Sequence, residues 1–349
     1  MARNKIVTNS NVFQKLERLA AARPISSADR YIATNRSEQT WLTKSKFEED
    51  FVLDHSTKIF PLTHEGRNYF ILSNIDPPEL PDGLKTIPIN SSLLTALLSD
   101  KDVFLPNLDG LAVYDSIFFP VEKDSYSGHD SALLLQFCVP LTLLEAESGG
   151  GFDTPLAVAR VALLCASKSS GLRTLPLNQS TLDACAQLTL EESSIPVSLM
   201  SRALISVRWE HCFLDLYRCV ERLFSIPTIV DLKGKLQIQQ SGLAISKTLE
   251  ELISWRKPEE DGLASLILDC NLIASDFHTD YIKLDTSCPP NYSYQSTAKH
   301  IYKLRNSIVH FRAITELPKL AESAWQRLVQ FLVDLINALY LKYHADLKV

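Results

Sequence analysis

The residues best suited to chemistry lie between 296 and 313, where an arginine and a histidine stand five positions apart. Asn306 follows Arg305 directly, and His310 follows after three further residues. Histidine titrates near neutral pH, so its imidazole can carry a proton during a reaction. Arginine has a planar guanidinium that can bind a phosphate or a carboxylate through two parallel N–H···O hydrogen bonds. The pattern indicates acid–base chemistry beside an anion, although Arg-x4-His alone occurs by chance in many chains.

A helix drawn through 297–310, with residues about 100° apart, has two distinct faces. Arg305 falls inside the apolar arc, whose members are Ala298, Ile301, Tyr302, Leu304, Ile308 and Val309. A guanidinium that points into a core needs an anion, because an unpaired buried charge is very costly. Polar residues follow one another along a second face: Lys299, Lys303, Asn306 and His310.

The segment 209–224 predicts a second helix that can supply this anion. Glu221 lies at the edge of its apolar arc, between Tyr217 and Leu214, whereas Asp215 and Arg218 fall on the opposite, solvated face. We therefore expect a Glu221–Arg305 ion pair that holds the guanidinium beside His310. The alternative is a purely structural ion pair, with His310 acting as a cation at a helix C-terminus, where the helix dipole stabilises positive charge.

The phrase around the motif, YKLRNSIVH, resembles the signature of the HEPN superfamily, the higher eukaryotes and prokaryotes nucleotide-binding domains. It is most similar to HEPN domains of bacterial defence proteins, including the ApeA-like group, and 213–224 resembles their first long helix. Phe311 stands where many relatives have glycine. The resemblance covers 195–349 and implies an all-α bundle; residues 1–190 resemble nothing known to us.

This resemblance implies a metal-independent endoribonuclease of a bacterial antiphage-defence or toxin system. RNA carries its own nucleophile, the 2′-OH, so the protein needs only a proton carrier and a cation for the phosphate. By resemblance, His310 is the general acid/base, Arg305 the phosphate clamp and Asn306 a positioning donor. Lys299 and Lys303 would contact the RNA backbone.

The resemblance also implies partners. Family members that cut RNA generally form dimers in which two Arg/His pairs line one cleft. We expect RNA as substrate, with tRNA as one candidate, and a homodimer formed through the C-terminal bundle, where 319–344 is broadly apolar. A regulatory protein partner is a further expectation. No cofactor and no metal are expected.

Two readings from other classes stay open. Some HEPN domains only dimerise or bind partners, so the chain is alternatively a non-catalytic interaction module that regulates another protein. The third reading is a helical scaffold on which the polar face has no nucleic-acid role. Other candidates are weaker: His211 and Asp215 read as a surface pair, and His300 as a solvated side chain.

The helices and strands predicted around these residues indicate an α+β protein of two domains. This number of domains fits the length of 349 residues. A mixed α+β domain, 1–190, would sense a trigger, regulate the nuclease or bind a partner; an all-α HEPN-like domain, 195–349, follows. In the first, we expect strands over 67–73, 111–120 and 131–139, and helices over 11–22, 91–99 (with Asn90 as cap), 155–167 and 178–188. In the second, the predicted helices are 198–225, 228–240, 244–256, 260–277, 294–310 and 319–344.

Composition excludes several classes of protein. The net charge of −6 gives no bulk attraction to nucleic acid or anionic membrane, so any such binding needs a local patch. The seven cysteines are scattered without a Cys-x-x-Cys pair, and we expect them to be reduced packing residues. A polar start and the lack of a long apolar run predict a cytoplasmic protein with no membrane contact.

Overall fold

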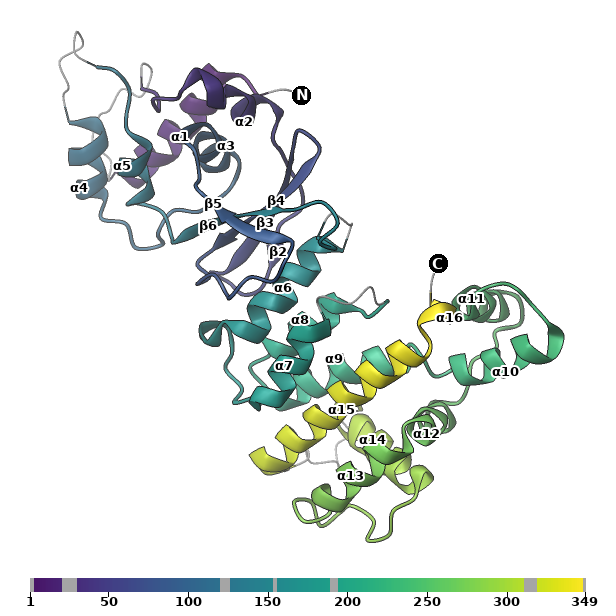
Figure 1. The fold of residues 1–349 in the computed structure, drawn as a ribbon. Coiled ribbons are helices and arrows are strands. Elements are labelled where there is room, and N and C mark those ends of the chain that lie inside the picture. Colours follow the sequence, from purple (N-terminus) through teal and green to yellow (C-terminus); the bar gives the residue numbers. More distant parts are fainter. Residues whose placement is uncertain are drawn as a thin grey trace. The chain divides into compact units, whose positions relative to one another are not determined.

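The computed structural model describes residues 3–20, 30–119, 126–152, 156–188, 194–310 and 319–347 (Figure 1). The chain divides into two compact units, Met1–Val158 and Ala159–Val349. The α+β class predicted from sequence is confirmed: an antiparallel sheet with helices is followed by a largely helical region. The helices near 157 and 179 group with the second unit, although the sequence analysis placed them in 1–190.

The N-terminal unit is built on an antiparallel sheet of six strands within the described residues. Along the sheet the order is β1-β3-β4-β6-β5, and β2 also pairs with β3. The strands are β1 (Lys46–Phe47), β2 (Phe51–Val52), β3 (Lys58–His64), β4 (Arg67–Ser73), β5 (Leu84–Ile87) and β6 (Leu141–Ala146). The two short strands β1 and β2 therefore share one edge of β3 in succession.

Helices pack on one face of this sheet. Phe60 and Leu62 of β3 share a buried core with Phe13 of α1 and Leu94 and Leu97 of α3. The helical segments of this unit are α1 (Lys5–Leu19), η1 (Arg36–Glu38), α2 (Gln39–Lys44), α3 (Ser91–Asp100), α4 (Gly110–Val113), the π-helix η2 (Tyr114–Phe118) and α5 (Ser131–Leu135). The predicted cap of α3 is confirmed, because the Asn90 side chain accepts a hydrogen bond from the backbone N–H of Leu93 at 2.8 Å.

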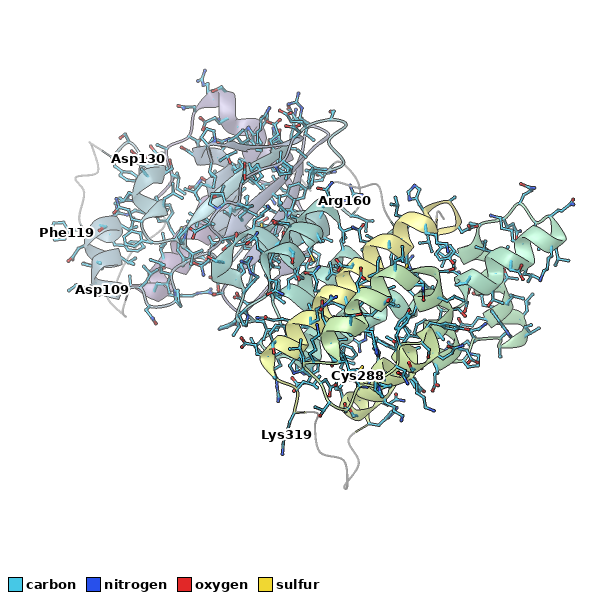
Figure 2. All side chains as sticks on the ribbon, turned by 60° about the horizontal axis from the view of Figure 1, so that its bottom comes forward. Asp109, Phe119, Asp130, Arg160, Cys288 and Lys319 are labelled. Atoms are coloured by element: carbon cyan, nitrogen blue, oxygen red, sulfur yellow. The ribbon has the colours of Figure 1, made fainter. Side chains whose placement is uncertain are left out.

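Two of the three predicted strands are wrong. The run 111–118 is helical, since the Asp109 carboxylate accepts from the backbone N–H of Leu111 and starts α4 (Figure 2); residue 120 lies outside the described residues. The run 131–135 is also helical, with Asp130 capping Ala132 in the same way. The strand that does pair with β4 is β6, which follows this helix.

The second unit is helical throughout its regular structure. Its elements are α6 (Ala157–Lys168), η4 (Ser170–Leu172), α7 (Gln179–Leu188), α8 (Val197–Leu204), α9 (Trp209–Glu221), α10 (Ile226–Leu236), α11 (Gly242–Ile253), α12 (Glu259–Asp269), α13 (Asn271–Tyr281), α14 (Tyr294–Val309), α15 (Glu322–Lys342) and α16 (His344–Leu347). The helices predicted over 198–225 and 260–277 are each two helices, broken after Leu204 and at Cys270.

Helix α15 is the core of this unit rather than a free surface. It packs against α7, α9 and α13, and its apolar side chains are buried on more than one side. The sequence analysis attributed the expected dimer to the apolar surface of 319–344. The described part of that segment buries this surface within the chain, so a homodimer would need a different face.

Two observations concern the predicted setting of the protein. No helix in the described ranges is long and apolar enough to cross a membrane. All seven cysteines are buried and free, as expected of packing residues; Figure 2 shows Cys288 among the helices of the second unit.

Gly262 of α12 meets Phe224, which lies in the turn that follows α9. A Cβ atom on Gly262 would lie 2.6 Å from the Cβ of Phe224, closer than real side chains come. This contact sets how near the start of α12 comes to the end of α9, where Glu221 lies.

We expect Gly262→Ala to lower the free energy of unfolding by about 1–3 kcal/mol, the usual cost of overpacking a tight contact. Gly234→Ala is the matched control. It lies in α10, where an added Cβ meets nothing within 4 Å, and alanine favours a helix interior by up to about 1 kcal/mol. Urea unfolding of the two variants makes the comparison; equal stability would contradict the close contact.

Candidate functional site

The start and the end of helix α14 determine where the residues of the predicted motif lie. It begins with a capping box, in which the side chains of Ser293 and Ser296 each accept from the other's backbone N–H. It ends at His310, whose backbone N–H donates to the carbonyl of Asn306 at 2.9 Å. Arg305 therefore lies just before the last turn of the helix, and His310 follows the helix directly.

Arg305 points inward and meets carboxylates from two other helices. Its side chain is 17% exposed; Nη2 lies 3.6 Å from Oε1 of Glu221, and Nη1 lies 3.5 Å from Oε2 of Glu259. Nη1 also donates to Oδ1 of Asn306 at 3.0 Å. The guanidinium carbon is 5.8 Å from the centre of the Tyr217 ring, within cation–π range. The expected Glu221 contact is present, whereas Glu259 and Tyr217 were missed.

The electrostatic balance of this cluster is negative, because two carboxylates face one guanidinium. Burial raises the pKa of Glu221, and the charge of Glu259 raises it further, while Arg305 opposes both effects. Burial and Glu259 likewise raise the pKa of the Tyr217 hydroxyl. Both shifts disfavour the ionised form, and burial contributes most to each.

The cluster also makes few hydrogen bonds for its number of polar atoms. The Arg305–carboxylate distances of 3.5 and 3.6 Å exceed the roughly 2.7–2.9 Å of a charge-assisted hydrogen bond. Within the described residues, Glu259 Oε2 and Tyr217 Oη are buried without a hydrogen-bond partner. Charge holds the group together more than hydrogen bonding does.

The predicted polar face of α14 reaches the surface. Lys299, Lys303 and His310 are exposed, and Asn306 is half-buried. Phe311, which the sequence analysis noted as a departure from the family pattern, lies outside the described residues. The arrangement therefore combines a shielded cation with an accessible imidazole at the end of one helix.

His300, interpreted from sequence as solvated, is mostly shielded on the same helix. Its side chain is 12% exposed, and Nε2 lies 3.2 Å from Oδ2 of Asp285. Burial lowers the pKa of His300, and Asp285 opposes this effect. Nearby, Cys288 Sγ lies 3.8 Å from Nδ1 of His278, and burial raises the pKa of this thiol to about 11. A thiol so protonated is a poor nucleophile, so this cluster is not the better candidate.

Asp215 was also placed wrongly, on a solvated face. It is buried, and Arg202 binds it with two hydrogen bonds of 2.6 Å, from Nε and Nη2. Arg218 adds a third at 3.1 Å. The break between α8 and α9 allows this pair to form, because the two helices fold back on each other.

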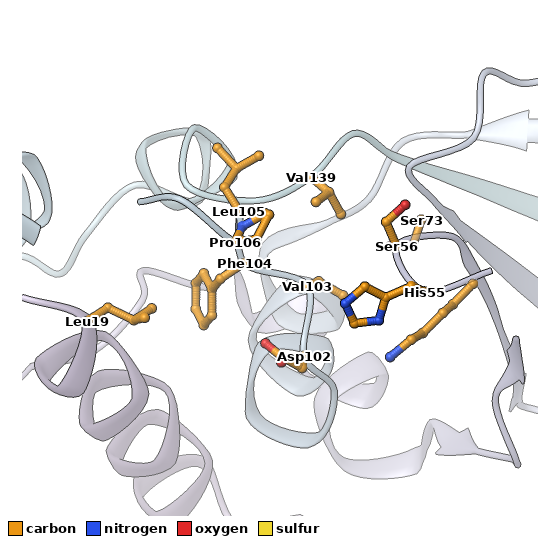
Figure 3. Close-up of a pocket in the computed structure, with 11 residues that line it drawn as sticks. Leu19, His55, Ser56, Ser73, Asp102, Val103, Phe104, Leu105, Pro106 and Val139 are labelled. Carbon is orange, nitrogen blue, oxygen red and sulfur yellow. The ribbon is translucent and has the colours of Figure 1, made fainter. Parts of the chain in front are cut away.

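The N-terminal unit contains a separate cleft of about 440 Å³, the size of a small-molecule site. Its walls are mainly apolar, and its charged or titratable groups are His55, Lys58 and Asp102 (Figure 3). It includes none of the predicted site residues. In the described ranges, no group of three His, Cys, Asp or Glu side chains is arranged to hold a metal ion.

Comparisons with models of protein families, with curated proteins and with solved structures find no match to this chain.

Because two carboxylates flank Arg305, each can compensate for loss of the other. We expect Glu221→Gln or Glu259→Gln alone to change the free energy of unfolding by less than about 0.5 kcal/mol. The double variant leaves the guanidinium without a carboxylate and should cost about 1–3 kcal/mol. A double-mutant cycle by urea unfolding tests this; additive effects would contradict mutual compensation.

The Glu221→Gln comparison has a predicted pH dependence. The folded pKa of Glu221 is raised, so ionisation of this carboxyl destabilises the fold as pH rises from the ordinary glutamate value through the folded one. Glutamine does not titrate. The stability of the variant relative to the native chain should therefore increase across that acidic window and then stay constant.

Proposed function

We propose that the helical unit is a metal-independent endoribonuclease of a bacterial antiphage-defence or toxin system, acting in the cytoplasm on RNA, with tRNA as one candidate substrate. One observation carries this proposal: Arg305 is paired with Glu221 just before the last turn of α14, and the exposed His310 follows at the end of the same helix. The likeness of YKLRNSIVH to the HEPN signature supports it.

The proposed chemistry uses the RNA's own 2′-OH. His310 takes the proton of this hydroxyl, and the oxygen attacks the adjacent phosphorus. The bond to the 5′-oxygen of the next nucleotide breaks, and this leaving oxygen takes a proton from the imidazolium of His310. Arg305 stabilises the charge that develops on the phosphate, and Glu221 orients the guanidinium. The products are a 2′,3′-cyclic phosphate and a 5′-hydroxyl.

The remaining roles follow from exposure and charge. Lys299 and Lys303 project from α14 and would contact backbone phosphates without reading sequence. A second copy of the chain would supply a second Arg/His pair to a shared cleft. The N-terminal unit would sense a trigger, restrain the nuclease or bind a regulatory protein.

A second candidate function is a non-catalytic interaction module. A specific observation favours it: Arg305 already faces two carboxylates and the Asn306 side chain, so its charge is balanced without RNA. In this reading α14 is a structural helix, and its exposed face binds a protein partner.

Cleavage without metal distinguishes the two functions. We expect purified protein to cut RNA in EDTA and to leave 2′,3′-cyclic phosphate ends. His310→Ala should abolish cleavage while RNA affinity stays nearly unchanged, because a general base acts mainly in the transition state. His211→Ala, another exposed histidine, is the control. Cleavage that stops in EDTA and returns with Mg²⁺ would contradict the metal-independent mechanism.

The lysines should act on binding rather than on chemistry. Lys299→Ala and Lys303→Ala should each weaken RNA binding and reduce the slope of log affinity against log salt by about one. Lys247→Ala, an exposed lysine of α11, should leave the slope unchanged. Fluorescence anisotropy across a salt series measures all three; native-like slopes for the α14 variants would remove the face from the RNA path.

A further inference from the structure

We infer that Glu259 restrains the site by occupying Arg305, and that an RNA phosphate binds the guanidinium only when this carboxylate is displaced or neutralised. The inference rests on the proposed function and adds a regulatory residue to it. It begins with the charge balance: Glu221, Glu259 and Arg305 together carry one negative charge when both acids are ionised. A phosphate that approaches this cluster is repelled as well as attracted.

The two carboxylates stand at different helix ends. Glu221 ends α9, whose core residues Phe213, Leu216 and Val220 are fully buried. Glu259 begins α12, directly after the non-helical segment 254–258, in which Ser254 has a left-handed backbone (φ 53°). Both side chains are 36% exposed, and Glu259 is the one that follows a non-helical segment.

Glu259 is also the less satisfied of the two groups. Its Oε2 is buried with no hydrogen-bond partner within the described residues, although Arg305 lies 3.5 Å away. A buried carboxylate oxygen without a hydrogen bond forfeits its hydration and gains only charge attraction in return. Moving Glu259 into water recovers that hydration, so its displacement by a phosphate is favoured more than that of a well-bonded carboxylate.

Neighbouring cations act on the cluster from outside it. Arg218 and Arg256 both lower the pKa of Glu221. Each is hydrogen-bonded to another carboxylate: Arg218 shares Asp215 with Arg202, and Arg256 binds Glu250. Neutralising Glu259 leaves the Glu221–Arg305 pair, in which the guanidinium keeps its orientation and has unused N–H donors for a phosphate.

The test is Glu259→Gln in the full-length chain, with Glu260→Gln as the control for the same chemical change one residue later in α12. The first readout is the rate at which phenylglyoxal modifies Arg305, followed by mass spectrometry of its peptide, with Arg327 as internal reference. The second is RNA affinity in a His310→Ala background, and the third is single-turnover RNA cleavage.

We expect Glu259→Gln to increase Arg305 modification and RNA affinity about fivefold each, the effect of one half-exposed charge interaction. Glu260→Gln should change neither. Unchanged Arg305 modification in folded Glu259→Gln overturns the restraint. Faster modification without RNA binding or cleavage in any variant supports the restraint and rejects the ribonuclease. If Glu259→Gln does not fold, Glu259→Asp, which draws the charge back by one methylene, replaces it with the same readouts.

Discussion

The helical unit depends on the placement of one guanidinium in an apolar setting. Arg305 occupies a core-facing position of α14, so burying that helix requires anions from the helices around it. The end of α9 supplies Glu221, and the start of α12 supplies Glu259. Gly262 allows these two helix ends to come close, because any side chain there would strike Phe224. Helices α9, α12 and α14 thus pack together around the charge of Arg305.

The predictable part of this site is the part that helical periodicity controls. The period of α14 places Arg305 inward, and the period of α9 places Glu221 at the edge of its core face. The contact between Glu259 and Arg305 was not predicted. The helix predicted from sequence begins at residue 260, one position after the start of α12, and no sequence pattern indicates that residues 259 and 305 are close in space. Asp215 escaped for a related reason: its partner, Arg202, belongs to a helix that the sequence analysis merged with α9.

In the N-terminal unit the errors come from apolar runs that suit either a strand or a helix. The runs 111–120 and 131–139 are rich in residues that favour strands, yet each is preceded by an aspartate that caps a helix, Asp109 and Asp130. Those caps were the available signal. Strand β3, which the sequence analysis did not predict, contains Pro61. Its carbonyl accepts from Glu48 N–H in the break between β1 and β2. The N and the C=O of one residue point to the same edge of a strand. The N–H that Pro61 lacks would therefore face the gap between β1 and β2, where no strand residue needs it as a donor.

A hydrogen-bond deficit alone does not distinguish a reactive site from a structural one in this protein. In the described residues, His278 of α13 and Thr297 of α14 also have a buried polar atom without a hydrogen-bond partner. What separates the Arg305 cluster is its charge. A structural ion pair needs one carboxylate, and a second one raises the pKa of the first and opposes any approaching anion.

A site that must bind phosphate only under some conditions benefits from that repulsion. The carboxylates that hold the guanidinium in place also limit the access of phosphate to it. The surplus acid, more than the missing hydrogen bonds, is therefore the feature of this cluster that a purely structural role leaves unexplained.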